Sequence, residues 1–444
     1  MKLKKYVNYL FILGSLLSSS FFASAQVRKI KIDEAIGLSI SNSHQLRYDS
    51  ARITEASAAL LEARGKKLPD VSFSGSHIRL NNMDLQIKTV RSSDSIPRPR
   101  SKISSATYGL VNFSVPLYSG SRIKYGIESA RYLAEAAKFD AIGNRDEIIL
   151  NTINAFDNLY KAKAAVDLVK ENLGSAKERV KQFTSFERNG VIPRNDLLKV
   201  ELQQSNIELS VLDAENNWKL ANINMNIMLG LPDSTTLEPD INSFEAVDKL
   251  LAVEAFIQAA QQHRSDVFSL ELRKKAAAIG IKAVKSELYP SIAITGGYIA
   301  LYIPNLVTVT NILNVGIGVQ YSLSSLWKNN SKVQQAQARD IQVQASQALL
   351  SDAIRLQVHE AYLEYVLSIK KIDTYKNAVA QAEENYSIVK NKYDNALATT
   401  TDLLDADVAQ LQSRLNYAFS QADASAAYSK LLKAAGILDN STKK

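Results

Sequence analysis

Three aspartates lie close together near the C-terminal end of the chain, in the segment YDNALATTTDLLDAD at residues 393–407. They are Asp402, Asp405 and Asp407. Asp402 and Asp405 stand three positions apart, so their side chains would share one face of a helix. Rings of acidic side chains bind and select cations and can gate a constriction. This spacing therefore indicates a cation-selective site, provided that several copies of the segment meet.

A related segment, FERNGVIPRNDLLKVE at residues 186–201, occurs about two hundred residues earlier. Asp196 takes the place of Asp402 there, but Lys199 stands where the later segment has Asp405. Both segments read as tight turns between long helices. If three chains assembled, an acidic ring built from the two turns of each chain would therefore not be six-fold symmetric.

No pattern in the sequence supports catalysis. The four histidines are scattered and lack the spacing of metal ligands; they are His44, His77, His263 and His359. A Gly-rich phosphate loop, a nucleophile elbow and an H-E-x-x-H motif are all missing. We expect no enzyme activity and neither a cofactor nor a metal.

The first 25 residues have the pattern of a secretory signal peptide. MKLKKYVNYLFILGSLLSSSFFASA starts with three lysines, continues with an apolar run from Val7 to Leu17, and ends in an A-x-A site before Gln26. A membrane anchor is the alternative, but the apolar run is too short for one. We expect the mature chain to leave the cytoplasm.

Composition narrows the class of protein further. The chain has no cysteine, so it has neither disulfides nor a lipid-modified Cys after the signal. Its net charge of +8 becomes 8 − 3 = +5 without the lysines of the signal, and no dense Lys/Arg run indicates nucleic acid. After the signal, no apolar run reaches the length of a membrane-spanning helix. Transmembrane strands, which give a weak signal in sequence, remain compatible with this composition.

The chain reads as two copies of one pattern. Asp196 and Asp402 are separated by 402 − 196 = 206 positions, and so are Gly230 and Gly436, since 436 − 230 = 206. Each half reads helix, strand, strand, very long helix, turn, helix. We expect the following division: signal peptide 1–25, first repeat 26–231, linker or equatorial segment 232–251, second repeat 252–438 and C-terminal tail 439–444.

Four segments have the period-two alternation of strands. They are expected at about 71–80, 107–117, 291–302 and 312–323. In the second and fourth, apolar side chains take alternate positions and polar or small residues take the others. The apolar set is Val111, Phe113, Val115, Leu313, Val315, Ile317 and Val319.

The helices are too long for an ordinary globular domain. No proline occurs between Arg122 and Glu187, and an apolar stripe with 3-4 spacing can be followed through most of this stretch to Phe183. About 66 residues at a rise of ~1.5 Å give a rod of roughly 100 Å. This is coiled-coil periodicity, but many seam positions are Ala or Asn. Because such a seam buries little area, the helices require neighbours.

The strands require neighbours as well. Four strands cannot close a membrane barrel, which needs about eight or more. An open sheet with an apolar face would leave exposed edges. Three chains would supply 3 × 4 = 12 strands. The expected fold is therefore mainly helical with membrane β-structure: a trimeric 12-stranded β-barrel, four strands per chain, continuing into a long antiparallel coiled-coil α-barrel.

At this point the sequence resembles the TolC-like outer membrane efflux protein family over essentially its whole mature length. The resemblance rests on the duplicated plan, on ALLEARGKKLPDVSFSG before the first strand, on FSVPLYSGSRIKYGIESA at 113–130, and on the turn YDNALATTTDLLDADVAQLQSRLNYA. One departure is Gln320, which stands where the first half has Pro116, so the second strand-to-helix junction is expected to differ.

The resemblance implies a homotrimer in the outer membrane of a Gram-negative bacterium, with a long periplasmic extension. Its implied partners are outer membrane lipid, a periplasmic adaptor (membrane fusion) protein and an inner membrane transporter of the RND, ABC or MFS type. It implies no nucleic acid. The chain would be the passive exit duct of a tripartite efflux or type I secretion system.

The resemblance also assigns roles to the two turns. Asp402 and Asp405 match the acidic ring at the tunnel entrance, to which Asp196 would contribute. Helix capping is the alternative for Asp402, because acidic residues stabilise helix N-termini, and the residues leave both roles open. Asp405 is expected to face the pore and Asp407 to be a solvated outer residue.

The turn residues themselves would contact the adaptor, with ordinary turn packing as the alternative for each. They are Asn189, Gly190, Val191, Ile192 and Pro193 in the first turn, and Ala396, Leu397, Ala398 and Thr399 in the second. The competing function is a non-conducting periplasmic or surface coiled-coil scaffold. The alternating strands argue against it, since a scaffold does not need paired lipid-facing strands.

Overall fold

The computed structural model describes residues 27–84, 102–240, 250–304 and 306–438. The expected signal peptide, the expected tail and part of the expected linker lie outside the described residues. The described chain forms two compact units. We call them the tip unit, residues 27–48, 142–240, 250–264 and 351–438, and the sheet unit, residues 49–84, 102–141, 265–304 and 306–350.

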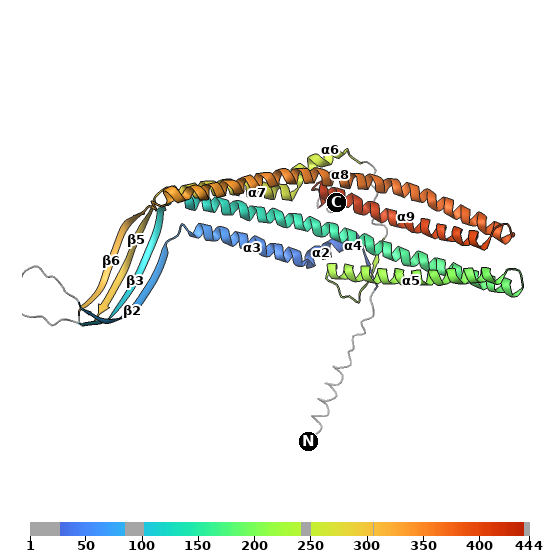
Figure 1. Ribbon diagram of the computed structural model, residues 1–444, viewed down its shortest axis with the longest axis horizontal. Helices are drawn as coiled ribbons and strands as arrows, with labels where there is room; N and C mark the ends of the chain where they lie inside the picture. The colour runs from blue at the N-terminus through green and yellow to red at the C-terminus, as the bar shows by residue number, and fades with distance from the viewer. Residues whose placement is uncertain (1–26, 85–101, 241–249, 305, 439–444) are drawn as a thin grey trace, which may run out of the picture. The chain divides into compact units, whose positions relative to one another are not determined.

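The chain is mainly helical, and its elements follow one another as labelled in Figure 1. In order they are β1 (Val27–Ile30), α2 (Ile32–Asn42), α3 (His44–Gly65), β2 (Asp70–Asp84), β3 (Lys102–Tyr118), α4 (Arg122–Arg188), α5 (Arg194–Leu229), β4 (Thr236–Pro239), α6 (Val253–His263), α7 (Ser265–Lys285), the 3-10 turn η2 (Ser286–Leu288), β5 (Ser291–Ile303), β6 (Val307–Gln320), α8 (Ser325–Asp394) and α9 (Thr400–Ala434). Among the described residues, no helix combines the length and the apolarity needed to cross a membrane.

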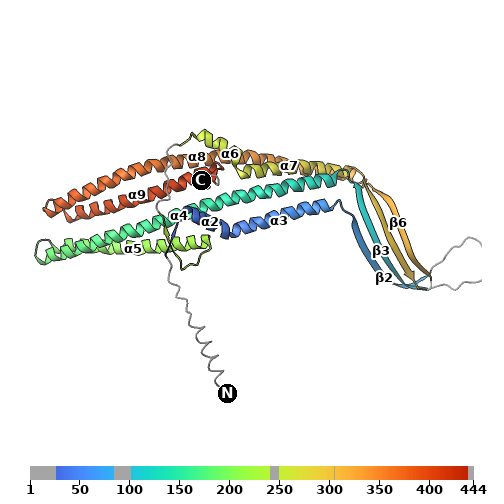
Figure 2. The same cartoon turned by 180° about the vertical axis from the view of Figure 1, so that it is seen from behind.

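The sheet unit contains one antiparallel four-stranded sheet in the order β2-β3-β5-β6. Figure 2 shows these strands side by side from behind. The two hairpins β2-β3 and β5-β6 are joined through the β3-β5 pair, in which Val111 lies opposite Tyr298. β2 and β6 are the outer strands, so each has one backbone edge without a partner strand in the described part of the chain.

The fourth strand differs from its expected span of 312–323. β6 begins at Val307 and ends at Gln320. Its pairing with β5 has an irregularity between Ile299 and Leu301, and Asn311 there has a φ of 65°. A left-handed residue in a bulge interrupts the alternation of side chains, which explains why the sequence pattern begins only at residue 312. Tyr298 stabilises the bulge, since its hydroxyl oxygen accepts from the Asn311 backbone N–H at 3.2 Å.

The two strand-to-helix junctions differ, as Gln320 in place of Pro116 suggested. The first junction passes through Gly120 and Ser121, which have φ values of 61° and 69°. A Cβ at position 120 would lie 2.6 Å from the Ser286 carbonyl oxygen, so only glycine fits this approach. The second junction, after Gln320, has no residue with positive φ.

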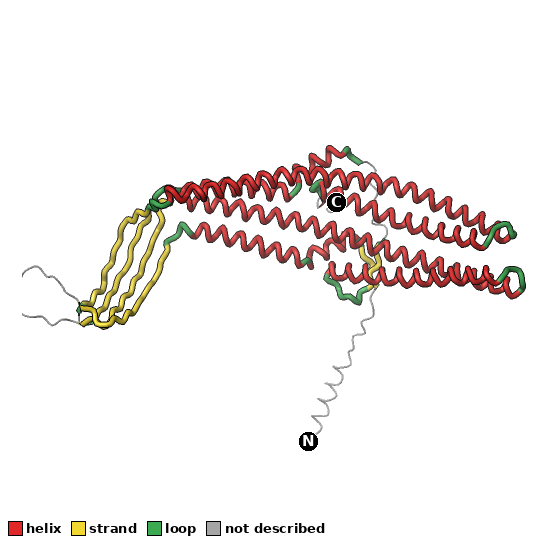
Figure 3. The backbone as a smooth tube through the Cα atoms, viewed as in Figure 1, coloured by secondary structure: helices red, strands yellow, loops and turns green. Residues whose placement is uncertain are grey.

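The tip unit contains two long helical hairpins, formed by residues 142–188 of α4 with α5 and by residues 351–394 of α8 with α9. Their turns appear in green at the helix ends in Figure 3. α4 covers almost the span expected from the proline-free run. The expected seam is buried at Val166, Val169 and Ala176 but is exposed at Asn151 and Asn158. There the helix buries apolar neighbours instead, such as Phe156 and Leu159, because β1 and β4 supply the apolar partners Ile30 and Leu237.

Each returning helix ends in the same way. Gly230 and Gly436 follow α5 and α9 with φ values of 69° and 72°. A Cβ at Gly230 would lie 2.9 Å from the Asn42 side chain, and one at Gly436 would lie 2.8 Å from the Arg264 backbone nitrogen. Asn42 is the last residue of α2 and Arg264 directly follows α6. Each glycine therefore allows the end of a long helix to approach the end of a short helix closely: α5 approaches α2, and α9 approaches α6.

Candidate functional site

The two tip turns have the same backbone construction. Each is a Schellman motif, in which a left-handed residue ends the helix and the next N–H reaches back to the last turn. Val191 N–H donates to the Phe186 carbonyl at 2.8 Å, and Leu397 N–H donates to the Lys392 carbonyl at 2.7 Å. The left-handed position is Gly190 in the first turn, with φ 69°, and Ala396 in the second, with φ 59°.

Most of the expected adaptor-contacting residues are accessible. The residue after the left-handed position is strongly exposed in both turns, at 68% for Val191 and 77% for Leu397. Ile192 and Ala398 are half-buried, and the other expected contact residues are exposed: Asn189, Gly190, Pro193, Ala396 and Thr399. An exposed apolar side chain at equivalent places in two turns is consistent with a surface that receives a partner.

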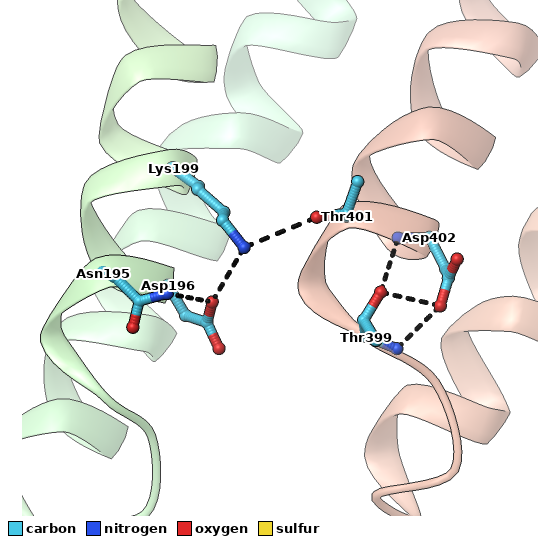
Figure 4. Close-up of polar contacts among 6 residues, drawn as sticks. All are labelled: Asn195, Asp196, Lys199, Thr399, Thr401 and Asp402. Carbon is cyan, nitrogen blue, oxygen red and sulfur yellow. Dashed lines mark hydrogen bonds and ion pairs between the residues drawn. The ribbon is translucent and has the colours of Figure 1, made fainter.

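Asp402 closes a capping box with Thr399, the N-cap residue of α9 (Figure 4). The Asp402 carboxylate accepts from the Thr399 backbone N–H at 2.9 Å and from its hydroxyl at 2.7 Å, while Asp402 N–H donates to the Thr399 hydroxyl oxygen at 3.1 Å. These bonds, the backbone one first, lower the pKa of Asp402. Of the two roles left open by the sequence, the capping role is present in the structure.

Asp196 occupies the equivalent third position of α5 but has no capping partner, because the N-cap residue is Pro193. Its carboxylate accepts instead from Lys199 Nζ at 3.2 Å and from the Asn195 side-chain amide at 3.3 Å. Lys199 also reaches across to α9, where its Nζ lies 3.5 Å from the Thr401 hydroxyl oxygen (Figure 4). The charge at Asp196 is thus balanced locally by a lysine that links the two hairpins.

Asp405 is exposed and shares a surface with Asp402, as their spacing predicted. Both line a shallow groove of about 400 Å³ between the end of α8 and the start of α9. Lys392 and Asn385 from α8 line the opposite side. The groove therefore presents two carboxylates and one ammonium group at the tip of the second hairpin.

The structure contradicts the expectation that Asp407 is a solvated outer residue. Its exposed fraction is 3%, and it forms a two-pronged ion pair with Arg179 of α4, which is 7% exposed. The distances are 2.8 Å from Arg179 Nη2 to Oδ1 and 3.1 Å from Nη1 to Oδ2. Tyr386 of α8 accepts from the same guanidinium at 3.3 Å. Loss of either partner would leave an uncompensated buried charge, which is strongly destabilising.

The ion pair lies beside an aromatic cluster that joins the two tips. Phe183 of α4 stacks on Tyr393 of α8, with ring centroids 5.4 Å apart and an interplanar angle of 9°. Leu197 of α5 and Leu403 of α9 pack against them, and both are nearly fully buried. All four helices therefore contribute to one apolar core below the turns.

The expected lipid-facing residues gather on one face of the sheet in the sheet unit. Residues directly opposite one another in antiparallel strands project to the same side. The register forms three such rows across the sheet: Val71-Phe113-Gly296-Val315, Phe73-Val111-Tyr298-Leu313 and Val115-Ile294-Ile317.

This apolar face is largely uncovered. Leu313, Ile317 and Val319 of β6 are 77%, 73% and 68% exposed. The three residues on β3, Val111, Phe113 and Val115, are half-buried by their neighbours in the sheet. Gly296 leaves room for the Phe113 ring, because a Cβ there would lie 2.3 Å from a ring carbon.

The described residues contain no group of three or more His, Cys, Asp or Glu side chains placed to hold a metal ion. Two features of the tip escaped the sequence reasoning. Arg179 carries no local motif, and between Leu403 and Leu431 the buried residues of α9 other than Asp407 are small and do not stand out as a stripe.

Comparison with known proteins identifies the family. The model of the family described as outer membrane efflux protein matches residues 35–231 and 256–437. The chain therefore belongs to the outer membrane efflux protein family, as its resemblance predicted. Membership confirms the outer membrane location with a helical periplasmic extension. It also favours a channel over the scaffold alternative.

Several solved structures share the fold. VceC of Vibrio cholerae is 17% identical, with a TM-score of 0.75 over 91% of this chain and 96% of that one. The CmeC channel of Campylobacter jejuni is 16% identical, with a TM-score of 0.75 over 92% and 86%. The MtrE channel of Neisseria gonorrhoeae in its open state is 16% identical, with a TM-score of 0.72 over 92% and 89%. No curated protein sequence matches the chain.

Proposed function

We propose that three copies of this chain form the passive exit duct of a tripartite efflux or type I secretion system. Each copy contributes four strands to a 12-stranded barrel in the outer membrane and two helical hairpins to a periplasmic tunnel. The energy for transport comes from an inner membrane transporter through a periplasmic adaptor. The observation that supports this proposal is that a single chain leaves apolar surfaces exposed on α5, on α8 and on its four-stranded sheet.

α5 is apolar on two opposite sides. One side packs into the tip unit through buried residues such as Ile207, Val211 and Met225. At about 100° per residue, a second set lies roughly on the other side of the helix. Its members are Leu220, Ile223 and Ile227, exposed at 58%, 37% and 66%. A stripe of this kind on a monomeric helix indicates a further packing partner.

α8 has the same property. Val358, Ala361 and Tyr365 are buried, whereas Leu356, Leu363 and Leu367 on the far side are 60%, 64% and 52% exposed. We call the exposed residues of α5 and α8 the two outer stripes. Counted from the left-handed residue of each turn, Leu220 is 220 − 190 = 30 positions away and Leu367 is 396 − 367 = 29 positions away.

The outer stripes therefore lie at matching distances from the two tips and on different hairpins. Contact between the α5 stripe of one copy and the α8 stripe of the next is heterologous, and such contacts form a ring when the rotation closes. The free edges of β2 and β6 impose the same requirement. Backbone groups left unpaired within a bilayer each cost several kcal/mol, so copies of the four-stranded sheet must join edge to edge until the barrel closes.

The tip assignments follow from this assembly. Asp405 and Asp402 would line the tunnel entrance, with Asp402 also serving as the cap of α9. Asp196 would contribute a charge that Lys199 partly offsets. The exposed turn residues, above all Val191 and Leu397, would contact the adaptor.

Planar-bilayer conductance of the purified chain tests the proposal. We expect discrete, cation-selective channels, and we expect the Asp402→Ala/Asp405→Ala variant to lose cation selectivity. Discrete channels with unchanged selectivity would support the duct but would contradict the role of the two aspartates at its entrance. A folded, trimeric chain that forms no channels would contradict the duct and return the scaffold as the explanation.

A further inference from the structure

We propose that the buried Arg179–Asp407 pair fixes the rotation of α9 about its own axis and thereby determines which side chains reach the tip groove. Asp407 and Arg179 would be positioning residues that act through Asp405. The part of this inference that concerns ion selectivity rests on the proposed function. The part that concerns the rotation of α9 does not.

The positions of the two aspartates on α9 support this role. Asp405 and Asp407 are two residues apart, which places them about 200° apart around a helix. Asp405 is exposed in the groove, and Asp407 is buried against α4. Holding Asp407 against Arg179 therefore holds Asp405 on the side of the helix away from α4.

Over the part of α9 that carries Asp407, apolar packing specifies this rotation weakly. Between Leu403 and the buried Leu431 and Leu432 near the end of the helix, the buried residues other than Asp407 are small: Ala406, Ser413, Ser420, Ala422, Ala424 and Ala427. Val408, the neighbour of Asp407, is 49% exposed. A rotation by about one residue, roughly 100°, would bury Val408 in place of Asp407, and hydrophobic burial would favour that change.

The ion pair opposes that rotation. A turned helix would leave the Arg179 guanidinium buried without its carboxylate, and an unpaired buried charge is strongly unfavourable. The partners of this guanidinium come from two helices, since Asp407 lies on α9 and Tyr386 on α8. Asn172 of α4 adds a contact of 3.4 Å to Asp407. Buried ionic groups of this kind are best known for fixing helix register.

The chain offers a matched control for the pair. Arg414 of α9 contacts Glu171 of α4 at 2.9 Å, so it joins the same two helices, two turns further along. The Arg414 side chain is 36% exposed and that of Glu171 is 59% exposed. An exposed pair contributes little to specificity. Removing it should leave the rotation of α9 unchanged.

The test uses a cysteine introduced at the groove, which is a unique thiol because the chain has no cysteine. In the full-length Asp405→Cys chain, the rate of maleimide labelling reports the exposure of position 405. We expect this rate to fall when Arg179→Met/Asp407→Ala is added, because these changes remove the buried charges and leave Val408 as the larger apolar side chain, whose burial then favours a turned α9. Arg414→Met should leave the rate unchanged.

Conductance of the same variants with Asp405 intact provides the second measurement. The Arg179→Met/Asp407→Ala chain should form channels with a reduced preference for cations, and Arg414→Met should retain it. If circular dichroism shows the double variant folded while its labelling rate and selectivity equal those of the parent, the inference is wrong. If the parent chain itself forms no channels, the proposed function fails, and the labelling rates still decide whether the pair controls α9.

Discussion

At the scale of single residues, the two tip turns solve one conformational problem with different residues. Both need a left-handed residue, which is Gly190 in the first turn and Ala396 in the second. Glycine adopts this conformation without strain, whereas a residue with a Cβ is disfavoured by about 1 kcal/mol or more. The second tip therefore holds local strain that the first tip lacks.

Exchanging the two residues tests this comparison. Ala396→Gly should stabilise the chain by about 1 kcal/mol, and Gly190→Ala should destabilise it by a similar amount. Among the described residues, apart from its two chain neighbours, no atom lies within 4 Å of a Cβ built at Gly190, so the expected loss comes from the backbone conformation. Denaturant unfolding in detergent, followed by circular dichroism, measures both changes. A destabilised Ala396→Gly chain would contradict the account of the turn.

The acidic residues show what the sequence can reveal at this scale. The shared face of Asp402 and Asp405 follows from their spacing alone, and the structure confirms it. The burial of Asp407 does not follow, because its partner Arg179 lies 228 positions away and no local pattern connects them. The ring of aspartates remains a prediction, because it depends on contacts between copies.

At the scale of elements, regular patterns predicted the long helix well and the strands less precisely. The proline-free run from Arg122 ends within one residue of the observed α4. β6 begins earlier than its alternation because Asn311 forms a bulge that breaks the period of two. The packing of α9 follows less clearly from its sequence, because between Leu403 and Leu431 its buried residues are mainly alanine and serine, whereas Val408 is 49% exposed.

At the scale of the whole molecule, one buried carboxyl group in α4 links stability to pH. Asp157 is 1% exposed, and neither of its carboxyl oxygens has a hydrogen-bond partner among the residues that the structure describes. Burial raises its pKa to about 8; Lys161 acts to lower the value and Asp423 to raise it. The folded chain thus keeps a proton that the unfolded chain releases above its ordinary pKa of 3.8.

This difference sets the sign of the expected pH dependence. Between about pH 4 and pH 8 the folded state binds more protons at Asp157, so the free energy of unfolding falls as the pH rises. The loss is on the order of a few kcal/mol. Melting temperatures at pH 5 and pH 8 should differ less in Asp157→Asn than in the parent. Asp167→Asn, at an exposed site on the same helix, should retain the parental difference. Equal pH dependence in all three chains would contradict the raised pKa.

The central claim is that one chain is a third of a closed ring, and a cross-linking measurement tests it most directly. Leu220→Cys and Leu367→Cys, introduced together, place one thiol on each outer stripe at nearly equal distances from the tips. Oxidation of the purified chain, analysed on a denaturing gel, should give products of one, two and three copies and none larger. Each single-cysteine chain should give no ladder. A ladder that continues beyond three copies, or a double variant that remains monomeric on oxidation, would contradict the closed ring.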